Sequence, residues 1–200
     1  MAPPVVYYVR HGETDWNAER RLQGQLDIPL NPLGRSQAMR SGEILRDLFG
    51  RDGLAAADFD YVASPLSRAR ETMELMRGGL SLDPAAYRTD PRLKEMSFGR
   101  WEGFTFTELQ AREAETLAAR ENDKWGFVVP GGESYAQLVV RVRAWYETVE
   151  RSTVVAAHGG VARALMAHLG IESEQSASAL REIGQGMVYV FEGRRLSRYE

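Results

Sequence analysis

Short runs of β-branched and aromatic residues alternate with segments of helical periodicity, and this alternation limits the chain to few folds. Four runs have the length and composition of strands: Val5–Val9, Tyr61–Ala63, Thr153–Ala157 and Met187–Phe191. After the last run, Glu192-Gly193-Arg194 leads into Arg195–Tyr199, which predicts a C-terminal hairpin. Because the apolar runs are continuous, we expect strands that are covered on both faces of a sheet.

Helices are predicted between these strands from caps and apolar spacing. Asn31-Pro32 places a capping residue before a proline and predicts a helix to about Phe49. Ser64-Pro65 repeats the signal, and four apolar residues then recur at helical spacing: Leu66, Ala69, Met73 and Met76. Two capping boxes predict further helix starts: Thr105 with Glu108, and Ser134 with Gln137. A last helix is predicted to follow His158 and to end near His168.

Strands alternating with helices predict an α/β protein, namely a three-layer α/β/α sandwich around a mixed, mostly parallel sheet. The length of 200 residues suits a single domain over residues 1–200. Residues 92–133 interrupt the alternation and are rich in aromatic side chains. We therefore expect this segment to be an insertion that lies over one end of the sheet and covers the active site.

Composition excludes several classes of function. The formal net charge is −3 with acids and bases interspersed, unlike the clustered basic surplus of proteins that bind nucleic acids or anionic membranes. No apolar stretch is long enough to span a bilayer, and no secretion signal is visible near the N-terminus. The absence of cysteine excludes disulfides, thiolate metal sites and cysteine nucleophiles. These features favour a cytoplasmic enzyme.

Three of the strand-like runs end in residues suited to the same chemistry. Their continuations are Arg10-His11-Gly12, Ser64 with Arg68, and His158-Gly159-Gly160. In a parallel sheet the carboxyl ends of the strands share one edge, where ligands bind. If the three strands are neighbours, two histidines and two arginines converge there, beside glycines and helix N-termini that offer N–H groups. Such a cationic pocket suits a tetrahedral dianion, which predicts phosphate.

A metal enzyme is the main alternative for a site of this kind. A catalytic zinc usually takes three protein ligands, and a two-metal phosphatase needs more. Only His11 and His158 are suitably placed, because His168 lies inside a predicted helix between apolar neighbours and is interpreted as structural. We therefore expect no metal and no other cofactor. By elimination, the nucleophile is an imidazole.

Six stretches that run in order from Tyr7 to Gly160 carry a family resemblance. They are RHGETDWN, LQGQLDIPLNPLG, SPLSRARET, LKEMSFGRWEG, PGGES and VVAAHGG. Through them the chain resembles the histidine phosphatase superfamily, also called the phosphoglycerate mutase-like superfamily. The resemblance implies a mixed, mostly parallel sheet of about six strands with one antiparallel member.

The resemblance also implies roles for the matching positions. His11 would be the nucleophile that becomes phosphorylated, and Glu95 would donate a proton to the leaving group. Three basic residues would hold the phosphoryl oxygens: Arg10, Arg68 and His158. Four further residues would border or bind the substrate: Asn17, Gln23, Gly24 and Gly159. For Gly132, Glu133 and Ser134, a binding role and simple helix capping both stay open.

Three functions remain open at this point. The leading one is a metal-independent phosphomonoesterase that hydrolyses small phosphorylated metabolites through a phosphohistidine. The second is a phosphoglycerate mutase that depends on 2,3-bisphosphoglycerate, and the third is a non-catalytic binder of phosphorylated ligands. A mutase needs extra fixed cations, whereas those of Phe98–Pro130 are separated in sequence and outnumbered by acids. We therefore expect a phosphatase with no nucleic-acid or membrane partner; its substrate and a homodimeric state stay open.

Overall fold

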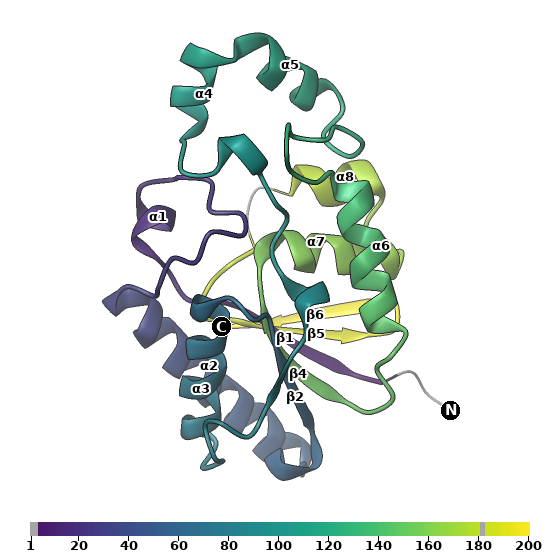
Figure 1. Ribbon diagram of the computed structural model, residues 1–200. Helices are drawn as coiled ribbons and strands as arrows, with labels where there is room; N and C mark the ends of the chain where they lie inside the picture. Colours follow the sequence, from purple (N-terminus) through teal and green to yellow (C-terminus); the bar gives the residue numbers. More distant parts are fainter. Residues whose placement is uncertain (1–3, 181–182) are drawn as a thin grey trace.

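A six-stranded mixed sheet forms the middle layer of the protein (Figure 1). The structure is a computed structural model that describes residues 4–180 and 183–200. The strand order is β3-β2-β4-β1-β5-β6. The strands are β1 (Val6–Arg10), β2 (Asp60–Ala63), β3 (Arg88–Thr89), β4 (Thr153–Ala157), β5 (Val188–Glu192) and β6 (Arg195–Tyr199). Only β5 runs against the others, so the predicted mixed sheet with one antiparallel member is confirmed.

The register of the central strands decides where the site forms. β1 pairs with β4 in parallel, with Arg10 opposite Ala157. β2 pairs with the other edge of β4, with Ala63 opposite Ala156. The residues that follow these strands therefore emerge side by side at one edge of the sheet. Among them are His11, Ser64 and His158, as the sequence predicts.

Helices cover both faces of the sheet and complete the three-layer sandwich (Figure 1). α2 (Pro32–Asp52) and α3 (Ser67–Gly79) lie on one face, and α6 (Tyr135–Tyr146) and α7 (Gly159–His168) on the other. Shorter helices are α1 (Asp15–Ala18), α4 (Phe106–Arg112), α5 (Ala114–Asn122) and α8 (Glu174–Ala179). Three 3₁₀ turns are η1 (Ala56–Asp58), η2 (Pro91–Leu93) and η3 (Gly99–Trp101). None of the helices within the described ranges is long and apolar enough to cross a membrane.

Two apolar clusters hold the layers together, one on each face of the sheet. Along β1, Val6 and Tyr8 enter the cluster under α6 and α7, whereas Tyr7 and Val9 enter the cluster under α2 and α3. All four are buried because successive strand residues point to opposite faces. The continuous apolar run in β1 thus serves both cores, and the strand carries His11 on a rigid support.

Most predicted helix starts are found, and one is wrong. The Asn31 side chain accepts from Gly34 N at 2.8 Å, and the capping boxes at Thr105 and Ser134 are both formed. In contrast, Ser64-Pro65 does not cap α3, which begins at Ser67 without a side-chain cap. Ser64 N instead donates to Ala156 O and continues the pairing with β4. The two-residue strand β3 was not predicted, because it has no apolar run.

The segment predicted as an insertion forms a small layer of its own. Figure 1 shows α4 and α5 standing apart from the sheet. Four buried side chains make a separate apolar cluster there: Trp101, Leu109, Leu117 and Val129. An isolated bridge between Arg21 and Thr105 ties this layer to the loop after α1. The limits of the segment at residues 92 and 133 stay a prediction.

Candidate active site

Two histidine rings contact each other edge-on at the carboxyl ends of β1 and β4. The ring centroids of His11 and His158 are 5.1 Å apart, and both residues are buried. The parallel register places them there, because Arg10 is opposite Ala157 and each histidine follows directly. His11 N also donates to Ala157 O at 2.9 Å, which extends the pairing by one residue. The predicted convergence of the two imidazoles is therefore present.

The hydrogen bonds of His11 determine which ring nitrogen is available for chemistry. Its Nδ1 lies 2.7 Å from Gly12 O. A carbonyl oxygen only accepts, so Nδ1 carries the proton and Nε2 keeps its lone pair. Burial, followed by the positive charges of Arg68 and Arg10, holds the pKa of His11 well below its ordinary value. The ring is therefore neutral, as a nitrogen nucleophile must be.

His158 is fixed by the side-chain hydroxyl groups of Ser64 and Tyr8. Its Nε2 lies 2.7 Å from the Ser64 hydroxyl, and the Tyr8 hydroxyl donates to its backbone carbonyl. Its Nδ1 is buried and has no hydrogen-bond partner. Burial, and then the charge of Arg68, lowers the pKa of His158 well below its ordinary value. The sequence predicts Ser64 both at a strand end beside the site and as a helix cap; it contacts His158 and does not cap α3, in agreement with the first prediction.

Arg68 brings a buried positive charge to the same edge of the sheet. The side chain starts in the first turn of α3 and is fully buried. Its Nη1 and Nη2 donate to the carbonyls of Leu26 and Gly24, each at 2.8 Å. Its Nε is buried without a partner. Burial lowers its pKa to about 10, so the guanidinium is charged at neutral pH, and an anion in the cavity would relieve the cost of burying it.

Arg10 and Asn17 complete the polar wall around His11. Arg10 Nη1 donates to Ile183 O at 2.7 Å, which anchors the guanidinium across the site. Asn17 forms a capping box with Thr14, and Gln185 Nε2 also donates to its side-chain oxygen at 3.2 Å. These contacts consume the oxygen of the amide. They leave its nitrogen as a donor, and Asn17 is among the residues that line the cavity.

Glu95 reaches the site from the loop after η2. Its Oε1 accepts from Met96 N at 2.8 Å, and its Oε2 accepts from Gly160 N at 3.1 Å, in the first turn of α7. The helix N-terminus therefore holds the carboxylate in place. Gly160 is required for this contact, because a Cβ there would lie 2.2 Å from Glu95 Oε1.

A half-buried arginine fixes the backbone of the Glu95 loop. Arg141, on α6, donates to the carbonyls of Arg92, Lys94 and Glu95 at 2.7–2.9 Å. The same guanidinium forms a bidentate ion pair with Glu133 at 2.9 Å. Glu133 also accepts from Ser97 N at 2.9 Å. Ser134 caps α6, Glu133 holds the loop, and neither residue is among those that line the cavity.

The cavity between these groups has a volume of about 160 Å³. Seven of the nine predicted site residues line it: Arg10, His11, Asn17, Gln23, Gly24, Arg68 and Glu95. His158 contacts the His11 ring edge-on and is not among the lining residues. Gly159 is buried beside Arg10 and Arg163. Three lining residues were not in the predicted set: Arg21, Leu22 and Phe98. Arg21 is paired with Glu19 and Glu108, so its charge is already compensated.

Two glycines allow the loop after β1 to lie directly on α2. A Cβ at Gly12 would lie 2.0 Å from Gly34 O, and a Cβ at Gly34 would lie 2.0 Å from Glu13 O. The two backbones are therefore in direct contact at the start of α2. This contact fixes the carbonyl of Gly12, which accepts from His11 Nδ1. The predicted Arg-His-Gly motif therefore needs glycine at position 12, because any Cβ there would collide with the backbone of Gly34.

A second cavity, of about 340 Å³, adjoins the first, since Leu22 and Phe98 line both. Its cations are Arg120, Lys124 and Arg163. Arg120 and Lys124 share one carboxylate, Glu121, at 2.8 and 3.2 Å. The sequence shows these cations only as separated positions, whereas the structure places Arg120 and Lys124 around one carboxylate.

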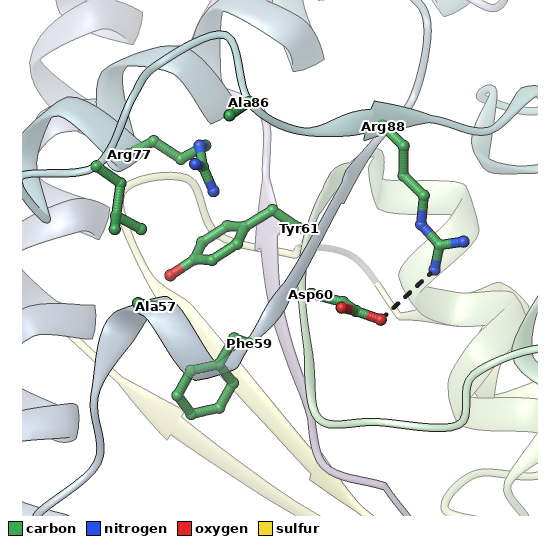
Figure 2. A pocket seen from close by; sticks show the side chains of 8 residues that line it. Ala57, Phe59, Asp60, Tyr61, Arg77, Ala86 and Arg88 are labelled. Carbon is green, nitrogen blue, oxygen red and sulfur yellow. Dashed lines mark ion pairs between the residues drawn. The ribbon is translucent and has the colours of Figure 1, made fainter.

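Other parts of the described structure offer no alternative centre for phosphoryl chemistry. Residues 4–180 and 183–200 hold no group of three histidine, aspartate or glutamate side chains that could bind a metal ion. A cavity of about 560 Å³ lies at the opposite end of β2 and contains no histidine (Figure 2). The third histidine, His168, ends α7 and packs edge-on against Tyr146. It lies outside the cavity, in keeping with its structural interpretation.

The fold and the site together place a neutral imidazole beside two guanidinium groups in a small cavity. The chain belongs to the histidine phosphatase superfamily (branch 1), whose family description matches residues 6–195. The family resemblance seen in the motifs is therefore confirmed. Membership supports an enzyme of phosphatase or mutase type.

Individual relatives are named after both activities. A probable phosphoglycerate mutase of Salmonella paratyphi C is 37% identical over 139 residues, which are 70% of this chain but only 60% of that protein. A mycobacterial glucosyl-3-phosphoglycerate phosphatase has 28% identity and a TM-score of 0.79, covering 98% of this chain and 96% of its own. A putative α-ribazole-5'-P phosphatase of Escherichia coli has a TM-score of 0.80 over 98% and 94%. Its identity of 24% supports the fold alone.

Proposed function

We propose that the protein is a phosphomonoesterase that hydrolyses small phosphorylated metabolites through a phosphohistidine on His11, without a metal. One observation carries the proposal most directly. His11 is held as a neutral ring with Nε2 available, between the guanidiniums of Arg10 and Arg68. A neutral imidazole attacks phosphorus, while fixed cations stabilise the charge that spreads over the phosphoryl oxygens.

The reaction proceeds in two displacements that balance charge and protons. His11 Nε2 forms a bond to phosphorus as the bond to the leaving oxygen breaks, and Glu95 gives its proton to that oxygen. The oxygen of a water molecule then bonds to phosphorus as the bond to His11 Nε2 breaks and its electron pair returns to the ring; the water gives a proton to Glu95, and inorganic phosphate leaves. Proton transfer of this kind typically accelerates a step by about 10²–10⁴-fold. Glu95 lines the cavity together with His11, as both steps require.

The experiment that tests this proposal is chemical trapping. Brief exposure to a labelled phosphomonoester should yield an acid-labile, base-stable adduct that maps to His11. His11→Ala should remove both the adduct and the turnover. His168→Ala is the matched control, because this histidine packs on Tyr146 outside the cavity, and it should retain both. A label on serine or a carboxylate would exclude the mechanism.

The mutase alternative is kept because of one specific observation. Arg120, Lys124 and Arg163 surround the cavity that adjoins the proposed phosphate site, and a mutase needs cations beyond those that bind one phosphoryl group. The relative named as a probable mutase is matched over only 60% of its length. We expect phosphate release to exceed interconversion of phosphoglycerates when 2,3-bisphosphoglycerate is present. An enolase-coupled assay run beside a phosphate assay compares the two rates, and faster interconversion would favour the mutase.

A further inference from the structure

The cavity at the far end of β2 has the composition of a binding site. It has a volume of about 560 Å³, within the range of pockets that hold small organic ligands. Asp60 and Tyr61 begin β2 on its floor, whereas Ser64, after the end of the same strand, contacts His158. The cavity is therefore separated from the proposed active site by the length of the strand.

Arg77 supplies a buried positive charge to this cavity. Only 6% of the residue is exposed, and its guanidinium carbon lies 4.3 Å from the centroid of the Tyr61 ring (Figure 2). Its Nε donates to Asp83 O at 2.8 Å. None of the ion pairs within the described residues includes Arg77, so no carboxylate neutralises it. A stacked tyrosine offsets only part of the cost of burying such a charge.

Arg88, on the edge strand β3, also borders the cavity, but its side chain lies with Asp60 on the opposite side of β2 from Tyr61 and Arg77 (Figure 2). The one acidic side chain in the wall is Asp60, which lies 4.0 Å from Arg88 and 3.6 Å from Arg151 (Figure 2). Asp60 is thus shared between two arginines and does not compensate Arg77. The cavity therefore keeps a surplus of positive charge, and a bound anion would remove it.

The rest of the wall is apolar and partly aromatic. Phe59, Tyr61 and Leu82 line it beside two alanines. Burial raises the pKa of Tyr61 to about 12, so its hydroxyl is uncharged and donates to Ala56 O at 2.9 Å. We propose that this cavity binds a small organic anion. Its carboxylate contacts Arg77, on the face of β2 where Tyr61 lies, and its apolar part lies against Phe59, Tyr61 and Leu82.

The proposed anion site and the phosphoryl site are carried by the same helix. Arg68 lies in the first turn of α3 and Arg77 near its end, about 14 Å apart along a helix axis at 1.5 Å per residue. A ligand that bridges both arginines would have to span the buried helix. The two sites therefore bind separate molecules.

Calorimetric titration with 2-naphthoate, in the presence of excess inorganic phosphate to fill the active site, tests the proposal. We expect saturable binding, with 2-naphthamide at least about tenfold weaker because it lacks the charge. Arg77→Gln should weaken naphthoate binding by about tenfold, whereas Arg70→Gln, at an exposed position of α3 outside the cavity, should leave it unchanged. If Arg77→Gln does not fold, Ala86→Glu, at an exposed position that lines the cavity, should weaken naphthoate binding by adding a negative charge.

Two results would overturn the proposal. One is an absence of saturable naphthoate binding, or equal binding of the amide. The other is binding that phosphate abolishes or that neither Arg77→Gln nor Ala86→Glu changes, because the ligand would then occupy the active site or another surface. Neither result bears on the phosphohistidine, which is tested by label on His11.

Discussion

Gly160→Ala displaces a carboxylate from the proposed active site without touching the chemistry of any side chain. Gly160 lies in the first turn of α7, and its φ is not in the left-handed region, so alanine fits the backbone. The added Cβ would lie 2.2 Å from Glu95 Oε1, closer than the 3.0 Å below which real Cβ contacts essentially never occur. Glu95 therefore has to move by about 1 Å, a displacement that costs about 100-fold in rate when it affects a reacting group.

The loss should depend on the leaving group. An alkyl phosphate needs a proton on its leaving oxygen, so we expect kcat/KM to fall by about 100-fold. For p-nitrophenyl phosphate, whose leaving group departs without a proton, kcat/KM should fall by less than about threefold. kcat/KM is the suitable parameter because it covers the steps through phosphorylation of His11. Phosphate release from both substrates, measured over a range of concentrations, supplies it.

A matched glycine separates this effect from helix stabilisation. Gly50, in α2, has no atom within 4 Å of a hypothetical Cβ. Gly50→Ala should therefore raise the free energy of unfolding by about 0.5–1 kcal/mol and leave kcat/KM unchanged. Combining Gly160→Ala with Glu95→Gln should cause no further loss on alkyl phosphates, because both act on one carboxylate. Additive losses, or an alkyl phosphatase activity retained by Gly160→Ala, would refute the reasoning.

Three further predictions follow from the same geometry. Because His11 and His158 have pKa values well below those of histidines in the unfolded chain, the free energy of unfolding should fall as pH drops below about 6.5, by up to about 2.7 kcal/mol per pH unit. Urea titrations over a range of pH measure this slope. His11→Gln should reduce the slope, and an unchanged slope would contradict the prediction. Arg141→Lys should lower the free energy of unfolding by about 2–3 kcal/mol and impair alkyl phosphate hydrolysis, because lysine cannot replace the five hydrogen bonds to Glu133 and three carbonyls. The control Arg143→Lys, in the exposed pair with Glu147, should change the free energy of unfolding by less than about 0.5 kcal/mol. Excess chelator should leave activity intact, since Arg10 and Arg68 supply the positive charge; a loss that a divalent cation restores would point to a metal enzyme.

The sequence predicts those parts of the fold that depend on local patterns. β1, β4 and the hairpin of β5 and β6 are found within one residue of their predicted limits, because continuous β-branched runs favour buried strands. Asn31 and the two capping boxes are found because a cap is a local interaction. β3 was missed because its two residues pair only through the position of β2.

The candidate site was predictable where a residue follows a strand, and not where its partner comes from another layer. His11, His158 and Arg68 converge because parallel register is implied by the fold class. For Ser64 the sequence predicts both a strand end and a helix start, because a serine before proline favours a helix start; the hydroxyl contacts His158, 94 residues away, and does not cap α3. Likewise, Arg141 and Glu133 reveal their role only when α6 packs on the Glu95 loop.

The contact between Gly12 and Gly34 has a consequence for anyone who builds a mutant library of this protein. Each glycine faces backbone rather than a side chain, with 2.0 Å from a hypothetical Cβ to a carbonyl oxygen in both directions. No second substitution can make room, because a peptide group cannot be replaced by a smaller one. In a saturation screen both positions should therefore accept glycine alone, even under selection for folding without activity. Gly160 should accept alanine under that same selection, since its obstacle is the movable end of Glu95. Comparing the two screens would distinguish a glycine that the chain needs in order to fold from one that only its chemistry needs.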